Sequence, residues 1–193
     1  MDELVSETDY FNLDIAGGDF SGQCASLVSI SKGRLARIGL SRTHLHKLDL
    51  DRVVFDACDM ANAVWEMARL DKVTLNDCRL IGLGLSRSSI KECVFQACEA
   101  SLADFRAITC KKSRFIRCKL QGADFQHADL RHVVFENCDL RGAQMFSAKL
   151  EGADLRGSEI ENLQIGIEHL RGAIVDPAQA AYLAGYMGLK VMF

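Results

Sequence analysis

Residues 120–130 read LQGADFQHADL, with a large apolar side chain at every fifth position and a small one two residues before it. The same spacing holds for the 33 multiples of five from Ile15 to Val175. Of these, 30 carry Leu, Ile, Val, Met, Phe or Trp, and the exceptions are Ala25, Ala100 and Cys110. A period of five matches neither an α-helix nor a β-strand, whose side-chain periods are about 3.6 and about 2 residues. It requires a backbone that turns a corner every five residues.

Four such corners close a square coil of twenty residues with the large side chains inside. Each coil buries its apolar face only by stacking on the next one, as in other solenoids. The sequence therefore predicts an all-β fold, a right-handed quadrilateral β-helix of about eight coils over residues 13–175. At the strand spacing of about 4.8 Å the rod is on the order of 40 Å long. Residues 1–12 form an acidic segment before it.

Composition and charge favour a cytoplasmic protein. The chain has 193 residues, a formal net charge of −3 and eight cysteines. Its first twenty residues contain six acids and no base, which is unlike a signal peptide, and no apolar run is long enough to cross a membrane. We therefore expect reduced thiols in a cytoplasm.

Five cysteines recur twenty residues apart at the small inward position: Cys58, Cys78, Cys98, Cys118 and Cys138. Zinc sites usually combine several Cys and His ligands in a tetrahedron, and no histidine shares this column. We expect these cysteines to fill the wall as small apolar residues, with no bound metal and no cofactor.

The repeat stops after Val175. Asp176 and Pro177 suit the N-cap and first position of a helix over residues 178–187, which Gly188 can end. Residues 176–193 are predicted to cap the solenoid. Their apolar content exceeds what a lid needs, so we also expect a homodimer through this segment. The predicted dimer interface consists of Tyr182, Leu183, Tyr186, Met187, Val191 and Phe193.

Two resemblances sharpen these expectations. The segments 122–125 (GADF), 152–155 (GADL) and 171–173 (RGA) resemble the consensus of the pentapeptide-repeat family, A-(D/N)-L-x-x. The pattern Asp176-x-x-Gln179-Ala180-x-x-Leu183, followed by Gly188-Leu189-x-Val191, resembles the C-terminal cap of the Qnr-type and mycobacterial fluoroquinolone-resistance members. That resemblance implies a dimer that binds DNA gyrase or topoisomerase IV by mimicking B-form DNA. No loop interrupts the repeat, so the chain is more similar to the mycobacterial type.

The charge distribution both supports and limits such mimicry. Residues 120–193 hold ten acids and six bases, whereas residues 21–119 hold ten acids and seventeen bases. A DNA-like surface would therefore be confined to the acidic end, where a dimer would join. Its candidate acids are Glu151, Asp154, Glu159, Glu161 and Glu168. The alternative is a pentapeptide-repeat scaffold that binds another protein without DNA mimicry.

A second stacked column is basic: Lys32, Arg52, Lys72 and Lys112, interrupted by Glu92. It could contact phosphates or an acidic protein, but a solvated edge that discourages aggregation is the favoured interpretation, because no aromatic residues are interleaved with it for base stacking. We expect no direct binding of nucleic acid. No catalytic set of residues is evident, so an enzyme is not expected.

Overall fold

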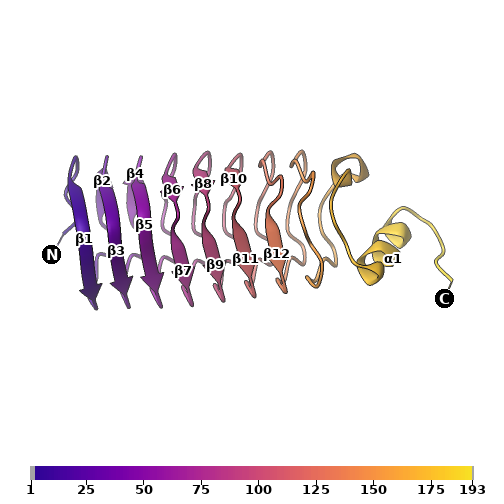
Figure 1. Ribbon diagram of the computed structural model, residues 1–193, viewed down its shortest axis with the longest axis horizontal. Coiled ribbons are helices and arrows are strands. Elements are labelled where there is room, and N and C mark those ends of the chain that lie inside the picture. The colour runs from indigo at the N-terminus through magenta and orange to yellow at the C-terminus, as the bar shows by residue number, and fades with distance from the viewer. Residues whose placement is uncertain (1–2, 193) are drawn as a thin grey trace.

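The computed structural model describes residues 3–192, which form one β-solenoid closed by a short C-terminal helix (Figure 1). The strands are β1 (Asp9–Ala16), β2 (Cys24–Ser26), β3 (Ser29–Ala36), β4 (His44–His46), β5 (Asp49–Asp56), β6 (Arg69–Asp71), β7 (Thr74–Asn76), β8 (Ser89–Lys91), β9 (Val94–Gln96), β10 (Thr109–Lys111), β11 (Arg114–Ile116) and β12 (Val134–Glu136). A 3₁₀ helix spans Ile167–Leu170, and α1 spans Pro177–Tyr186.

The coils stack in parallel with a step of twenty residues. Ile15 pairs with Leu35, and Leu35 pairs with Phe55. One column of bridges contains eight levels, at residues 19, 39, 59, 79, 99, 119, 139 and 159. This confirms the expected number of coils. The first strand begins at Asp9, so regular structure starts four residues before the expected boundary at residue 13.

The predicted inward column forms the core. Every multiple of five from Phe20 to Ile165 is buried, whereas Ile15, Leu170 and Val175 at the two ends are half-buried. Phenylalanines stack along the axis: the ring centroids of Phe95 and Phe115 are 4.5 Å apart, and those of Phe105 and Phe125 are 4.9 Å apart. The core is therefore continuous along the rod, as a solenoid requires.

All the corners but one use a left-handed backbone. The residue two positions after each inward centre has a positive φ from Glu7 to Gly172, with the single exception of position 167. Twenty-five of these corners are not glycine. At residue 167 the 3₁₀ helix Ile167–Leu170 replaces the corner, an irregularity that the uninterrupted numbering of the repeat did not predict.

The small inward position carries a recurring hydrogen bond. The thiols of Cys98 and Cys118 donate to the carbonyls of Leu75 and Phe95, both at 3.3 Å, and the hydroxyl of Ser158 donates to Phe135 O at 3.0 Å. Cysteine and serine therefore fill the same role, linking one coil to the inward centre of the previous coil. All five column cysteines are buried and all eight cysteines are free thiols, with only Cys24 exposed. Burial raises the pKa of the Cys93 thiol to about 11 and that of Cys110 to about 12.

The register can be tested with two substitutions to aspartate that are two residues apart. The Leu85 side chain is buried, whereas Arg87 is an exposed corner residue. Leu85→Asp buries an unpaired charge, which costs on the order of several kcal/mol, and should unfold the protein. Arg87→Asp should be tolerated, because aspartate accepts left-handed backbone better than most residues. Thermal unfolding followed by circular dichroism measures both variants, and equal tolerance would contradict the register.

The thiols can be tested by labelling. Denatured protein should yield eight reactive thiols, whereas native protein should yield one fast thiol, that of Cys24, because the other seven are buried and burial disfavours the thiolate. Cys24→Ser should remove the fast phase and nothing else. Several fast thiols in the native protein, or stoichiometric zinc by elemental analysis, would contradict a purely structural role for the buried cysteines.

Candidate interaction surfaces

A capping box starts the C-terminal helix. The Asp176 carboxylate accepts from the Gln179 amide at 3.0 Å, and the Gln179 side-chain oxygen accepts from the Asp176 amide at 3.0 Å. Pro177 occupies the first turn, where its missing N–H costs nothing. Hydrogen bonding from the Gln179 and Gly157 amides lowers the pKa of Asp176. The predicted N-cap and helix are confirmed.

The helix closes the solenoid through polar side chains. Gln179 is buried, and its side-chain nitrogen donates to Leu155 O at 2.6 Å and to Ser158 O at 2.7 Å. The Tyr182 hydroxyl accepts from the Asn162 amide at 2.7 Å. These contacts satisfy backbone groups that a further coil would otherwise have to satisfy.

The predicted dimer residues divide into two groups. Tyr182 and Leu183 are half-buried and pack against the solenoid core, so they serve the cap. Tyr186, Met187 and Val191 are 55%, 51% and 41% exposed, and Phe193 lies outside the described residues. Leu189 and Met192, which the prediction omitted, are also exposed. We call the exposed set Tyr186, Met187, Leu189, Val191 and Met192 the apolar terminus.

The five candidate acids do not share one side of the rod. In the repeat, each of four acids lies next to an inward centre. Glu151 is next to Leu150, Asp154 is next to Leu155, and Glu159 and Glu161 are on either side of Ile160. These centres belong to three different sides of the coil. Glu168 lies in the 3₁₀ helix. The structure therefore distributes the acids around the last two coils.

Arginines neutralise two of these acids. Both oxygens of Asp154 accept from Arg156, at 2.9 and 2.7 Å, and Glu159 pairs with Arg141 at 3.1 Å. Hydrogen bonding from Arg156 lowers the pKa of Asp154. Glu168 lies 3.4 Å from the His169 imidazole. Within residues 3–192, Glu151 and Glu161 form no ion pair, so they are the acids most available to a partner.

The pairing follows a motif that could have been found in the sequence. Aspartate just before an inward centre and arginine just after it point outward together, as in Asp104/Arg106, Asp129/Arg131, Asp139/Arg141 and Asp154/Arg156. In each pair the aspartate also accepts from the backbone amide of the arginine. The D-x-R spacing is thus an intrinsic ion pair of the repeat, and counting acids without it overstates the free negative charge.

Acids also interrupt the basic column. Glu92 lies 3.9 Å from both Lys72 and Lys91, and Arg52 pairs with Asp51. Lys32 and Lys112 form no ion pair within the described residues. Lys112 borders a shallow groove of about 320 Å³ whose lining is mixed in charge: Lys111, Lys112, Asp129, Arg131, His132 and Glu151. The arrangement matches a solvated edge better than a uniform stripe for phosphates.

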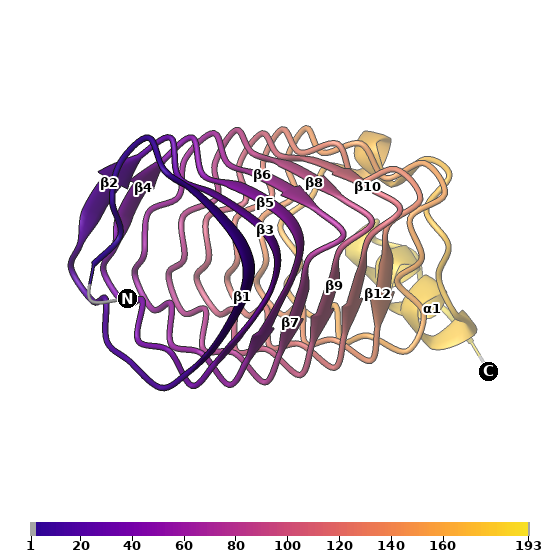
Figure 2. The same ribbon diagram turned by 60° about the vertical axis from the view of Figure 1, so that its left-hand side comes forward.

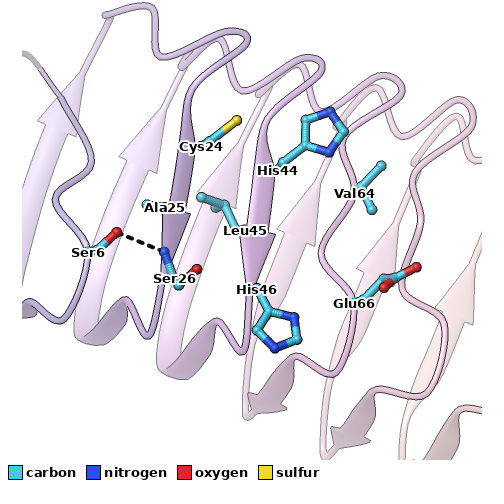
Figure 3. A pocket seen from close by; sticks show the side chains of 9 residues that line it. All are labelled: Ser6, Cys24, Ala25, Ser26, His44, Leu45, His46, Val64 and Glu66. Atoms are coloured by element: carbon cyan, nitrogen blue, oxygen red, sulfur yellow. Dashed lines mark hydrogen bonds between the residues drawn. The ribbon is translucent and has the colours of Figure 1, made fainter.

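A second groove, of about 390 Å³, lies on the outer face of β2 and β4 (Figure 3). Cys24 pairs in register with His44, and Ser26 with His46, while Glu66 lies one coil further along. In Figure 3 the two imidazoles point away from each other. Residues 3–192 contain no group of three His, Cys, Asp or Glu side chains arranged to hold a metal. The same residues contain no helix long and apolar enough to cross a membrane.

One family model and several solved structures match this chain. Residues 88–165 match the family model described as pentapeptide repeat region. Among solved structures, full-length QnrB1, a plasmid-mediated fluoroquinolone resistance protein, is 18% identical, with 94% of this chain and 100% of that chain covered and a TM-score of 0.40. HetL, a protein involved in heterocyst differentiation regulation from the cyanobacterium Nostoc sp. Strain PCC 7120, is 23% identical, with 90% and 89% covered and a TM-score of 0.24. No curated protein sequence matches this chain.

The family match covers the C-terminal half of the solenoid, and the coils before it have the same construction. The step of twenty residues, the buried column and the left-handed corners continue without change from Phe20 to residue 165. Residues 88–165 thus match the pentapeptide-repeat family, and the same construction extends through the coils before them.

Proposed function

We propose that the protein is a non-catalytic, dimeric binding protein of the cytoplasm whose partner is a type II topoisomerase, with the effect of modulating the enzyme's response to poisons such as quinolones. The observation that carries the proposal is the C-terminal cap. Its residues Asp176, Gln179 and Leu183 are those on which the resemblance to the fluoroquinolone-resistance members rests, and Gln179 uses its side chain to seat the helix on the last coil.

The apolar terminus supports self-association. Its five residues are each at least 41% exposed and lie within residues 186–192, where Lys190 is the one charged residue. Exposed apolar side chains gathered in one place mark interaction sites in soluble proteins. A two-fold contact between two such tips would join two rods end to end, with Glu151 and Glu161 near the joint.

Charge supports a limited form of DNA mimicry. The phosphates of a duplex surround its axis, so acids on several sides of a rod suit a duplex-binding groove better than a patch on one side would. Two rods of about 40 Å give about 80 Å, close to the length of 24 base pairs at about 3.4 Å each. The basic middle restricts this mimicry to the acidic coils beside the joint.

The paired acids favour a second function, a scaffold that binds another protein without imitating DNA. Asp154 and Glu159 are held by Arg156 and Arg141, and each such pair removes a charge that a DNA mimic would use. In this function the outer faces of the coils would recognise the partner by shape and hydrogen bonding. The two functions differ in whether binding depends on Glu151 and Glu161.

The dimer is tested by sedimentation. The wild-type protein should sediment with twice the chain mass of 21.3 kDa at micromolar concentration. Met187→Glu with Val191→Glu should give a folded monomer, because both side chains are exposed and would place charges in the joint. Leu27→Glu with Met67→Glu, two residues of matching exposure (51% and 42%) on early coils, is the control and should stay dimeric. A monodisperse wild-type monomer would contradict the proposal.

The partner is tested with purified gyrase. Titrating the protein should inhibit supercoiling or restore it in the presence of a quinolone. Glu151→Lys with Glu161→Lys should weaken this effect about tenfold and leave the fold intact, because two free acids become bases at the joint. Glu66→Lys with Asp77→Lys, which changes the charge equally but in the basic middle, should have little effect.

Two results would redirect the interpretation. If the wild-type protein neither inhibits nor rescues supercoiling at micromolar concentration, the topoisomerase is not its partner. If it acts but both double variants act equally well, binding does not use DNA mimicry and the scaffold function holds.

A further inference from the structure

One end of the solenoid is capped by a helix and the other ends in a strand. At the C-terminal end, α1 packs across the last coil, whereas at the N-terminal end β1 is the outermost strand (Figures 1 and 2). β1 pairs with β3 and, within residues 3–192, with no other strand. At eight residues it is among the longest strands in the protein. A long unpaired edge is a template for another strand.

The later coils identify the backbone groups that this edge leaves free. The amide just before an inward centre donates to the preceding coil: Asp49 N to Val28 O at 2.9 Å, and Val94 N to Val73 O at 2.9 Å. In the first coil Asp9 and Asp14 hold the equivalent positions, and no coil lies before them among residues 3–192. The carbonyls of Lys91 and Ala36 accept hydrogen bonds from the amides of Lys72 and Gly17 in the preceding coils. The equivalent carbonyls of the first coil are those of Phe11 and Ala16.

Side chains along this edge are only partly covered. Tyr10, Leu13 and Ile15 are half-buried against the end of the core, and Phe11 is 66% exposed. Leu4 is buried and covers one sector of the open end, and its amide donates to the Gln23 side chain at 2.8 Å. An added strand would bury the remaining apolar edge as each coil buries the one before it.

The acidic side chains along β1 determine which kind of strand could add to it. Glu7, Asp9, Asp14 and Asp19 are exposed and form no ion pair within the described residues, and the chain contains no lysine or arginine before Lys32. Two copies meeting through this end would bring like charges together, so the acids oppose self-pairing. They favour an incoming segment that is basic. The chain itself places Arg34 opposite Asp14 in β3.

We propose that β1 is a docking edge for an extended basic segment of a partner protein, which adds as a parallel strand and continues the solenoid by one partial coil. Backbone hydrogen bonds to Asp9, Phe11, Asp14 and Ala16 supply the affinity, as in other cases of strand addition. In the register of the coils, lysine or arginine residues five apart in the segment lie over Asp9 and Asp14 and determine its selection.

The test uses the full chain and a labelled peptide with two lysines five residues apart, each followed by leucine, and with glycine three residues after the first lysine, at the level of the left-handed corner Asn12. Fluorescence anisotropy should detect binding. Asp14→Pro removes the free edge amide without removing any hydrogen bond between coils, and should abolish binding while the melting temperature stays close to that of the wild type. Asp14→Asn removes the same charge but keeps the amide, and should retain most of the binding. Asp9→Lys with Asp14→Lys should weaken binding about tenfold. Glu151→Lys with Glu161→Lys, the same charge change at the other end, should not.

Several outcomes would overturn the proposal. Without any binding of the lysine peptide by the wild-type protein, β1 is not a docking edge. Binding that survives Asp14→Pro is a charge contact and not strand addition. If the wild-type protein instead self-associates in a manner that Asp14→Pro blocks, the occupant is a second copy. If no peptide binds and the Asp9→Lys, Asp14→Lys variant aggregates, the acids only protect the edge. Because these readouts involve neither gyrase nor the apolar terminus, they are independent of the topoisomerase proposal.

Discussion

The left-handed corner at every fifth residue is the constraint on which the rest of the structure depends. An L-residue in this conformation is unfavourable by roughly 1–2 kcal/mol, and most corners here are occupied by residues other than glycine. What holds them is the ladder between coils, such as the bond from the Arg37 amide to Asp56 O at 2.8 Å. Each coil thus fixes the corners of its neighbour, because the hydrogen bonds between coils offset the unfavourable corner conformation. The inward column, the outward charges and the flat sides all follow from this.

The repeat could be predicted because the spacing of the apolar residues, and not only their chemistry, determines the backbone. Burial at every fifth position leaves one register for the chain, and the structure adopts it from Phe20 to residue 165. The corner at residue 167 escaped prediction because its replacement by a 3₁₀ helix changes the backbone without changing the count. The apolar centres 165 and 170 stay in phase on either side, so nothing in the spacing marks the change.

The C-terminal segment was predicted less completely, for a different physical reason. Its helix was recognisable from Asp176 and Pro177, but apolarity alone could not say which residues face the solenoid. Gln179, Tyr182 and Leu183 lie three and four residues apart and so share a face of the helix. The most buried of them, Gln179, is polar, so the pattern of apolar residues does not identify the face that packs on the solenoid. Tyr182 and Leu183 therefore complete the cap, and the surface left for a partner shifts toward residues 186–192.

The charge pattern shows how a repeat can separate fold from recognition. The D-x-R pairs lie on the outward faces, yet each also holds its own turn through the aspartate and the amide two residues on. Such acids belong to the scaffold and offer little free charge to a partner. Glu151 and Glu161 at one end, and Asp9 and Asp14 at the other, have no ion-pair partner among residues 3–192. At the C-terminal end these acids lie beside the exposed apolar residues 186–192, and at the N-terminal end they lie along the unpaired edge of β1. The two ends therefore combine unpaired charge with a second feature that a partner can use.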